Sequence, residues 1–333
     1  MIMQFAFRPR LSISVLALAI VAWGCGPAAL AQAQGYPSKP IKIVVAYPPG
    51  GSTDLVARVI SDELSRGLGQ RVIVDNKGGG GTIIGTESVA RAAPDGYTLF
   101  YGTNAMVINS ALQEKLPYDP ITDFEPISLA AVQSLGIFVN PRLNLNSVPA
   151  LLAYAKANPG RLNFASSGNG SAQHLAGELM RSLGQVNIVH IPYTGVGTNA
   201  ITDLIAGNVD MMITSLFGIG EHVKSGRIKL IATTGSQRSP ATPDVPTVAE
   251  GGLPSYKMIS WQALFAPAGT SKTTIDRLNA EMRRVGEIKK VTDRLFENGL
   301  EYKPSTPAEL REMLVAERKL YVEIVKSTGA KTD

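Results

Sequence analysis

The sequence predicts an α/β protein with two lobes joined by two crossover strands. Short apolar runs typical of buried strands alternate with segments whose apolar residues recur every three or four positions, as on one face of a helix. This alternation predicts mostly parallel sheets covered by helices. A self-contained block, residues 138–237, lies between the two parts of another, residues 36–137 and 238–333. Because the chain leaves one block and later returns to it, we expect a ligand cleft between two lobes.

The first part of the outer block reads as strands that alternate with helices. Residues 41–47, 71–75 and 98–101 are expected to be strands, and residues 55–64 and 82–92 to be helices. The long apolar stretch at 127–139 is extended enough to cross from one lobe to the other.

The inner block repeats the pattern. Its expected helices are 148–158, 172–183 and 199–206, and its expected strands are 162–165, 186–191, 209–213 and 228–233. A strand at 256–265 would carry the chain back to the outer block. The remaining tail is helical, and Thr306-Pro307-Ala308-Glu309 is a capping box that predicts the start of a last helix.

The N-terminus has the three parts of a secretory signal. Arg8 and Arg10 give a basic start, residues 11–23 are apolar or small, and Ala29-Leu30-Ala31 fits an A-x-A cleavage site. A helix of that apolar run spans roughly 20 Å, which is short of the roughly 30 Å hydrocarbon core of a membrane. We therefore expect residues 1–31 to be a signal peptide, cut after Ala31 or Ala33.

Composition argues against several classes of protein. Cys25 is the only cysteine, so an exported chain cut after it has no disulfide and depends on its hydrophobic core. Lipidation of Cys25 stays an alternative, although Trp23 is unlike the residues of a usual lipoprotein box. The net charge is +5 at pH 7, but Lys and Arg are scattered and are not interleaved with aromatic residues, which argues against nucleic-acid binding.

The turn Pro48-Pro49-Gly50-Gly51 predicts an anion site. It follows an apolar strand and leads directly into a helix that begins near Ser52, Thr53 and Asp54. The first N–H groups of a helix have no partner within it and lie at the positive end of the helix dipole. A capped turn would explain the Ser, Thr and Asp, but not two glycines after two prolines. We interpret the glycines as leaving the amides bare for an anion.

The same strand–turn–helix plan recurs at residues 164–175 and 188–201, which predicts a small-molecule site built from backbone amides and hydroxyls. The four glycines Gly78–Gly81 lack the Gly-Lys-Ser/Thr ending of a phosphate-binding loop. We expect them to form a flexible turn near the cleft or a close contact of backbone with backbone. Tyr193 and Trp261 are candidates either for the cleft or for the core.

Cofactor and metal chemistry have weak support. Residues 195–200 match the loose dinucleotide fingerprint G-x-G-x-x-A, but no acidic residue ends a strand about 20 residues later, where a ribose would need one. Asp210 falls near the start of its strand. The three histidines, His174, His190 and His222, are not at metal-ligand spacing. We expect no cofactor and no metal.

A serine hydrolase is the main catalytic alternative. Its nucleophile would be Ser171 or Ser167, but the chain has no G-x-S-x-G nucleophile elbow. Ser171 is better interpreted as a helix cap, and His174 as a hydrogen-bonding residue of the cleft wall. We therefore predict no catalytic residue, and the hydrolase stays as an alternative.

Taken together, the motifs resemble the extracytoplasmic receptors of tripartite tricarboxylate transporters, the Bug-type solute-binding proteins. The resemblance runs from Tyr36 to the C-terminus. It is carried by YPSKPIKIVVAYPPGGSTDLVARVI, VIVDNKGGGGTIIG, DGYTLFYGTNA, DFEPIS, SSGNGSAQHL, HIPYTGVGTNAITDLIAGNVDMMI and VPTVAEGGLPSY. It implies a type II periplasmic-binding-protein fold that closes on its ligand, a periplasmic location, and delivery of the ligand to a two-component integral membrane permease. We also expect a monomer.

The resemblance also implies a site. In these receptors the loop after the first strand and a Ser/Gly-rich helix start in the second lobe hold one carboxylate through amides, hydroxyls and ordered water. The residues expected to bind ligand are Tyr47, Pro49, Gly50, Gly51, Ser52, Thr53, Asp54, Gly102, Thr103, Asn104, Ser166, Ser167, Gly168, Gly170, Ser171, His174, Tyr193, Thr194, Gly195, Thr214 and Ser215.

The chain departs from the family pattern at two places. The family commonly has Lys or Arg at the position of Thr194, and NKPGAGG where this chain reads NKGGGG. These departures concern the identity of the ligand, not how its carboxylate is held. The expected function is capture of a small organic acid by hinge closure. A receptor that presents the same closed form to a membrane signalling kinase is a further alternative.

Overall fold

The computed structural model describes residues 1–2, 35–193 and 198–329. The chain divides into Met1–Ser38 and Lys39–Asp333, and the fold described below is that of the second unit. The expected signal peptide with its cleavage sites and Cys25 lie outside the described residues, apart from Met1 and Ile2, as do Thr194 and Gly195. None of the described helices has both the length and the apolar character that a membrane span requires.

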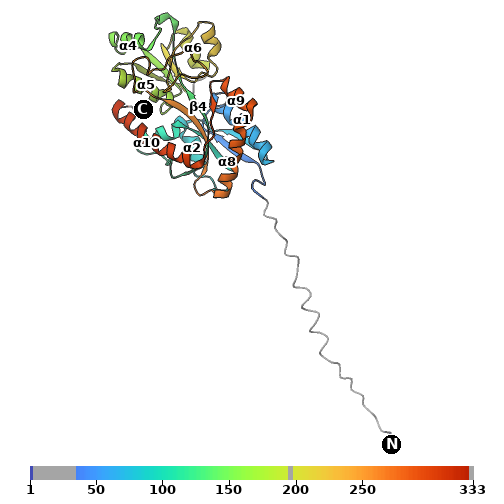
Figure 1. The fold of residues 1–333 in the computed structure, drawn as a ribbon. Helices are drawn as coiled ribbons and strands as arrows, with labels where there is room; N and C mark the ends of the chain where they lie inside the picture. The colour runs from blue at the N-terminus through green and yellow to red at the C-terminus, as the bar shows by residue number, and fades with distance from the viewer. Residues whose placement is uncertain (3–34, 194–197, 330–333) are drawn as a thin grey trace. The chain divides into compact units, whose positions relative to one another are not determined.

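Two sheets organise the second unit (Figure 1). The six-stranded sheet contains β1 (Ile41–Val45), β2 (Val72–Asn76), β3 (Thr98–Thr103), β4 (Phe124–Ser134), β10 (Ile259–Pro267) and β11 (Glu301–Tyr302). The five-stranded sheet contains β5 (Gly136–Val139), β6 (Asn163–Ser166), β7 (Val189–Pro192), β8 (Met211–Thr214) and β9 (Lys229–Thr233). The strand orders are β11-β4-β10-β3-β1-β2 and β7-β6-β8-β5-β9.

The expectation of mostly parallel sheets is wrong. β1 is parallel to β2 and β3, and β6 is parallel to β7 and β8. However, β10 is antiparallel to β3 and β4, β5 is antiparallel to β8 and β9, and β11 is antiparallel to β4. Parallel neighbours need a crossover connection, usually a helix. β4 carries the chain out of the six-stranded sheet and β10 carries it back, so these two strands run in opposite directions.

Helices accompany both sheets. With the six-stranded sheet lie α1 (Ser52–Leu68), α2 (Ile83–Ala90), α3 (Asn104–Leu112), α8 (Lys272–Gly286), α9 (Lys289–Phe296) and α10 (Pro307–Thr328). With the five-stranded sheet lie α4 (Val148–Ala157), α5 (Ala172–Gly184), α6 (Thr198–Ala206) and α7 (Gly220–Lys224). Single 3-10 turns are η3 (Gly80–Thr82) and η4 (Pro141–Leu143). The sequence pattern did not predict α3. This helix follows β3 without a turn because Thr103 both ends the strand and caps the helix.

The chain crosses between the sheets at Leu135 and again beyond Thr234. The Leu135 amide donates to the Thr234 hydroxyl (2.9 Å), and the Thr234 amide donates to the Leu135 carbonyl (2.9 Å). The Met258 amide, on the returning segment, donates to the Thr234 carbonyl (3.0 Å). Three segments are therefore hydrogen-bonded side by side at the crossing.

The last helix begins as the capping box predicts. The Thr306 hydroxyl accepts from the Glu309 amide, and the Glu309 carboxylate accepts from the Thr306 amide at 2.8 Å. α10 packs along the first sheet, and its far end reaches α5, where the Arg181 guanidinium donates to the Thr328 carbonyl (2.9 Å, Figure 1). Trp261 lies in the core with no exposed surface, so its place is the core and not the cleft.

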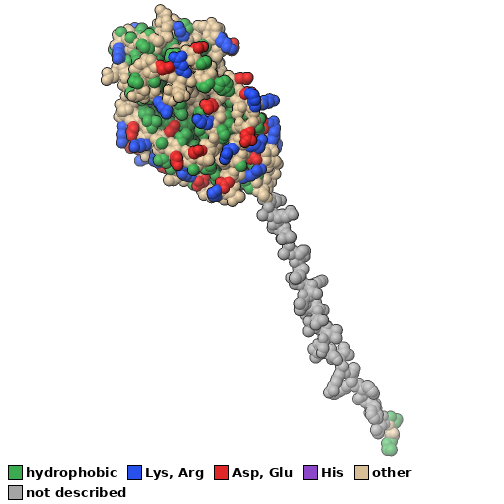
Figure 2. Space-filling view, viewed as in Figure 1, with side chains coloured by type: hydrophobic (Ala, Val, Ile, Leu, Met, Phe, Trp, Pro, Cys, Tyr) green, Lys and Arg blue, Asp and Glu red, His purple; other side chains and the backbone are tan. Residues whose placement is uncertain are grey.

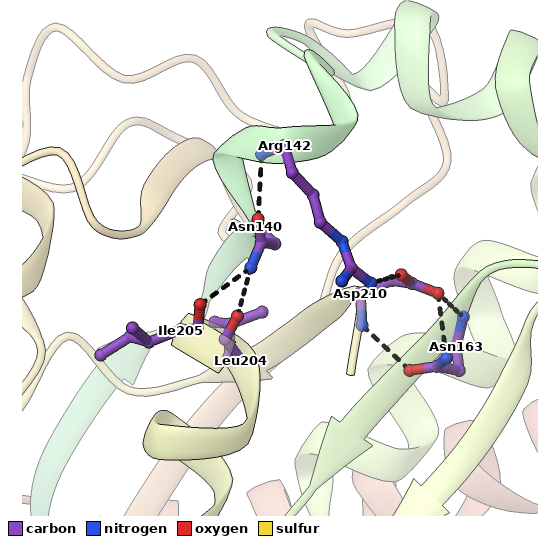
Figure 3. Close-up of polar contacts among 6 residues, drawn as sticks. All are labelled: Asn140, Arg142, Asn163, Leu204, Ile205 and Asp210. Atoms are coloured by element: carbon purple, nitrogen blue, oxygen red, sulfur yellow. Dashed lines mark hydrogen bonds and ion pairs between the residues drawn. The ribbon is translucent and has the colours of Figure 1, made fainter. Parts of the chain in front are cut away.

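Asp210 links two neighbouring strands of the five-stranded sheet, β6 and β8, at the ends that lie beside η4 (Figure 3). One carboxylate oxygen accepts from the backbone amide (3.1 Å) and the side-chain amide (2.9 Å) of Asn163, and the other accepts from Arg142 (3.1 Å). Asn140 continues the network by donating to the carbonyl of Leu204 at 2.6 Å. Asp210 therefore holds β8 to β6, a structural role that needs no nucleotide.

Replacing Asp210 by Ala should destabilise the fold, because the half-buried amides of Asn163 lose their acceptor. We expect a loss of about 2–4 kcal/mol in the free energy of unfolding, measured by denaturant titration. Asp244→Ala, at an exposed loop position, is the matched control and should change stability little. Equal stability of the two variants would contradict the role given to Asp210.

The face drawn in Figure 2 mixes positive and negative side chains. Lys and Arg are interspersed with Asp and Glu, so that face carries no continuous basic stripe. Several ion pairs join neighbours one helical turn apart, such as Lys272 with Asp276 and Lys289 with Asp293. Such exposed pairs contribute little to stability.

Candidate ligand-binding site

A cavity of about 420 Å³ is lined by residues from the connections of both sheets. Its volume lies within the range of roughly 300–1,000 Å³ typical of small-molecule sites. The described lining residues are Tyr47, Pro48, Pro49, Gly50, Gly51, Ser52, Thr53, Thr103, Asn104, Ala105, Gln133, Ser167, Ala172, Gln173, Ile201, Thr214, Ser215, Phe217, Gly218 and Ser260.

Three helices begin at this cavity. Thr103 caps α3 by accepting from the Ala105 amide (3.3 Å), and Ser171 caps α5 by accepting from the His174 amide (3.1 Å). α1 begins after Gly51 without any side-chain cap. The amides of Ser52 and Thr53 therefore have no acceptor among the described residues, and they lie at the positive end of the α1 dipole.

Asp54 holds the turn before α1 in this form. Its Oδ2 accepts from the Gly50 amide (3.0 Å) and from Arg58 Nε (2.9 Å), and its Oδ1 accepts from Asn76 Nδ2 (3.0 Å). Asn76 also donates to the Tyr47 carbonyl (3.1 Å), so the turn is tied to β2. Gly50 has φ +94°, a backbone conformation that favours glycine. One of the amides that the sequence suggested to be bare is thus used internally.

The charge of Asp54 is stabilised by these bonds. Burial opposes ionisation, but the hydrogen bonds from Arg58, Gly50 and Asn76 together outweigh it, so the pKa of the Asp54 carboxyl is lowered. With 5% of its surface exposed and no place in the cavity lining, Asp54 shapes the site from behind.

The second turn is tied to the first. The Tyr47 hydroxyl and the Thr103 hydroxyl are 3.0 Å apart. Asn104 is used differently, because its side chain accepts from the Trp261 amide (2.7 Å) and donates to the Tyr321 hydroxyl (2.7 Å). It therefore fastens α3 to β10 and α10. Gly102 is a packing position, since a Cβ there would lie 2.7 Å from the Phe100 ring.

Hydroxyls organise the turn before α5. The Ser166 hydroxyl is 2.6 Å from His190 Nε2 and accepts from the Gly168 amide (3.1 Å). The Ser171 hydroxyl donates to the Gly168 carbonyl (2.7 Å). The Ser167 hydroxyl, which faces the cavity, donates to Gln173 Oε1 (2.9 Å). These bonds fix the turn geometry, and neither Ser167 nor Ser171 directs its hydroxyl hydrogen to a histidine.

Two histidines lie behind this turn. The rings of His174 and His190 stack with centroids 4.2 Å apart, and the Gly170 amide approaches His174 Nδ1 at 3.4 Å. Burial, with the neighbouring His174, lowers the pKa of His190 to about 3. His190 is therefore uncharged near neutral pH, and the stacked rings support the turn from behind.

A second cavity of about 560 Å³ adjoins the first and shares Tyr47, Pro48, Ala105 and Ser167 with it. Gly79–Gly81 line it, and a Cβ on Gly81 would lie 3.1 Å from the Asn169 carbonyl. The glycine run thus brings the backbone of one lobe close to that of the other. Tyr193 also lines this cavity, with its hydroxyl donating to Asp203 (2.7 Å).

The expected site residues divide into four groups. The first cavity gathers Tyr47, Pro49, Gly50, Gly51, Ser52, Thr53, Thr103, Asn104, Ser167, Thr214 and Ser215. The second cavity alone takes Gly168, Ser171 and Tyr193. Neither cavity is lined by Asp54, Gly102, Ser166, Gly170 or His174. Thr194 and Gly195 lie outside the described residues.

Several lining residues were missed, among them Gln133, Gln173, Ile201, Phe217, Gly218 and Ser260. Gln133 left a signal in the sequence, since it is the one side-chain amide in the apolar crossover stretch 127–139.

The lining of the first cavity combines polar and apolar residues and carries no charge. Among its described residues there is no Lys, Arg, His, Asp or Glu. The described residues also contain no group of three or more His, Cys, Asp or Glu placed to hold a metal ion. The polar groups that this cavity offers are therefore helix starts, hydroxyls and side-chain amides.

The comparisons with known proteins agree on one family. Residues 56–329 match the family profile described as "Tripartite tricarboxylate transporter family receptor". This chain belongs to that family. Among its relatives, Protein BugT of Bordetella pertussis is 37% identical over 308 residues, which cover 92% of this chain and 94% of the relative. A protein from the tcbD-tcbE intergenic region of a Pseudomonas is 36% identical over 291 residues, covering 87% and 86% of the two chains.

Solved structures place the receptor among periplasmic binding proteins with two lobes. It superposes on the periplasmic binding protein BugD with a TM-score of 0.82 at 32% identity, covering 90% of this chain and all of that one. An R. palustris protein solved with adipate has a TM-score of 0.84 at 31% identity, with coverage of 89% and 99%. The two-lobed fold expected from the sequence is confirmed, and the family locates the receptor in the periplasm.

Asp54→Ala should loosen the turn before α1 and lower the stability of the fold. At pH 7 we expect the free energy of unfolding to fall by about 1–3 kcal/mol, because the Gly50 and Asn76 amides lose a charged acceptor. Since the pKa of Asp54 is lower when folded, its contribution is complete above the unfolded pKa of about 3.9 and is lost as the pH falls through the folded pKa. Unfolding curves of parent and variant should therefore converge in acid.

Asp62→Ala is the control for this experiment, because Asp62 lies on the exposed side of the same helix. A difference between parent and Asp54→Ala that stayed constant down to the lowest pH would contradict the assigned charge interactions.

Proposed function

We propose that this receptor captures a small organic acid in the first cavity, with one carboxylate bound at the uncapped start of α1. The acid is held by the amides of Ser52 and Thr53, by hydroxyls of the surrounding turns and by bridging water. The two lobes close around it, and the closed form delivers it to a two-component integral membrane permease. Closure is favoured because the bound acid makes contacts that only the closed state offers.

The observation that carries this proposal is the start of α1. Its amides lie at a cavity, at the positive end of a helix of 17 residues, and no acceptor among the described residues uses them. Asp54 takes the Gly50 amide only, so it fixes the turn and leaves the next amides available. An anion without a strong need for a cationic partner fits this environment.

The ligands of solved relatives support the chemical class. One relative was solved with adipate, and MatC of Rhodopseudomonas palustris was solved with malate at 31% identity and a TM-score of 0.81. Both ligands are carboxylates. A carboxylate bound by this receptor would interact, as proposed, with the start of α1.

The remaining expectations become part of the proposal. Residues 36–137 and 238–333 form one lobe and residues 138–237 the other, with the hinge where Leu135, Thr234 and Met258 are hydrogen-bonded. A signal peptide is removed near Ala31 or Ala33, and the mature receptor acts as a monomer without cofactor. It has no catalytic activity, because the hydroxyls of Ser167 and Ser171 are committed to Gln173 and Gly168.

Gly51→Asp should abolish binding of organic acids and leave the fold intact. A Cβ on Gly51 meets nothing within 4 Å, and its φ of −85° suits any residue, so the new carboxylate would occupy the place of the ligand's without strain. Gly51→Ala adds only a Cβ, which has no oxygen to cap the helix amides, and is the matched control. Calorimetric titration should show at least a hundredfold weaker binding for the Asp variant than for the Ala variant; equal affinities would exclude an anion at this turn.

Thermal-shift screening should identify a carboxylic acid among the ligands that stabilise the receptor. A ligand at 100 times its dissociation constant adds about 2.7 kcal/mol to the free energy of unfolding. The panel should contain mono-, di- and tricarboxylates, amino acids, aromatic acids and neutral sugars. Stabilisation by sugars alone would contradict the proposed substrate class.

A further inference from the structure

Two polar side chains that the carboxylate site does not use lie together on the crossover strands. Gln133 of β4 and Ser260 of β10 are directly paired in the antiparallel register. Both line the first cavity and both are largely buried, with 7% and 9% of their surface exposed. They belong to the segments that carry the chain between the sheets, and β10 and β4 lie two and three strands away from β1, the strand that leads into α1.

The side-chain oxygen of Gln133 lacks a hydrogen-bond donor among the described residues. This oxygen, Oε1, is also buried. A buried carbonyl oxygen without a donor is unfavourable, so most such atoms in proteins are satisfied by protein, water or ligand. Because this side chain lines a cavity, a ligand that carries a donor can satisfy it.

The sheet register sets Gln133 apart from the carboxylate end. Thr103, at the start of α3, pairs with Gln262 of β10, and Ser260 lies two residues farther along the same face of that strand. Two residues of a strand span roughly 7 Å, and β4 lies roughly 5 Å farther across the sheet. Gln262 lies between Thr103 and Ser260 in this register, and its Oε1 already accepts a hydrogen bond from the Tyr101 hydroxyl (3.0 Å). Gln133 and Ser260 are thus placed for a second group, at a distance from the first.

The surroundings favour a neutral second group. Ile201 and Phe217 supply an apolar part of the wall, and the described lining contains no cation for a second carboxylate and no acid for an amine. A hydroxyl or a carboxamide matches these conditions, because each carries a donor for Gln133 Oε1 and each can exchange a hydrogen bond with the Ser260 hydroxyl.

We propose that Gln133 and Ser260 form a second polar subsite that selects organic acids whose other end carries a hydroxyl or a carboxamide. This inference rests on the proposed carboxylate function and narrows its substrate class. The preferred ligand has a carboxylate at the α1 start, an apolar middle beside Ile201 and Phe217, and a neutral hydrogen-bond donor at the crossover strands.

The test uses acids that differ only at the far end. Calorimetric titration of the receptor would compare butanoate, pentanoate and hexanoate with their ω-hydroxy, ω-carbamoyl and ω-carboxy counterparts, and benzoate with its para-hydroxy and para-carbamoyl forms. In at least one series, the hydroxy or carbamoyl acid should bind about tenfold or more tightly than both the unsubstituted acid and the dicarboxylate.

Variants assign the preference to the subsite. Gln133→Met keeps the length of the side chain but removes its amide, so it should lower the affinity for the hydroxy or carbamoyl acid about tenfold and leave the unsubstituted acid within about twofold. Ser260→Ala should act in the same direction. Gln237→Met, at an exposed position, is the control and should change neither affinity. Gln133→Glu, a near-isosteric change, should shift the preference toward acids with an ω-amino group.

The outcomes separate this inference from the function on which it rests. If carboxylates bind but the far end makes no difference, or if Gln133→Met weakens all acids by the same factor, the subsite is wrong and the carboxylate site stands. If no carboxylate binds to the parent receptor, both proposals fail.

Discussion

The carboxylate of Asp54 is the interaction on which the candidate site depends. It lies in the first turn of α1, yet its partners are the Gly50 amide before the helix and the Asn76 side chain at the end of β2. These bonds fix the turn before the helix, and Gly51 at the N-cap has no side chain that could cap it. The helix start can then offer Ser52 and Thr53 amides to an anion, because the protein itself provides no competing acceptor among the described residues.

Other polar side chains around the cavity also serve to position backbone segments. Asn104 fastens α3 to β10 and α10, Ser171 caps α5, and the stacked pair of His174 and His190 supports the turn before it. Because these side chains are hydrogen-bonded or stacked within the protein, they hold the backbone in place. The polar groups that remain available in the cavity are backbone amides, hydroxyls and two glutamine side chains. In the proposed function, the anion is bound through preorganised dipoles and needs no fixed positive charge. The crossover strands β4 and β10 lie in the cavity wall, which links ligand contacts directly to the segments that join the lobes.

Much of this could be predicted from the sequence where the signal is local. The capping box at Thr306, the Pro-Pro-Gly-Gly turn and most helices and strands follow from neighbouring residues. The antiparallel pairing of β10 with β3 and β4 could not, because it depends on how the returning chain meets the sheet. Likewise, Asp54 reads as an N-terminal helix acid, but its bond to Asn76 spans 22 residues. Gln133 was missed although it is the one side-chain amide in the apolar stretch 127–139, and its pairing with Ser260 follows only from the sheet register.

The central claim is that a carboxylate is held by uncapped helix amides and not by a cationic side chain. A crystal structure of the receptor with a bound organic acid tests it most directly. The account predicts a carboxylate oxygen at roughly 2.7–3.2 Å from the backbone nitrogen of Ser52 or Thr53, at the level of the α1 start. A carboxylate paired with a Lys or Arg side chain, or located away from α1, would contradict it.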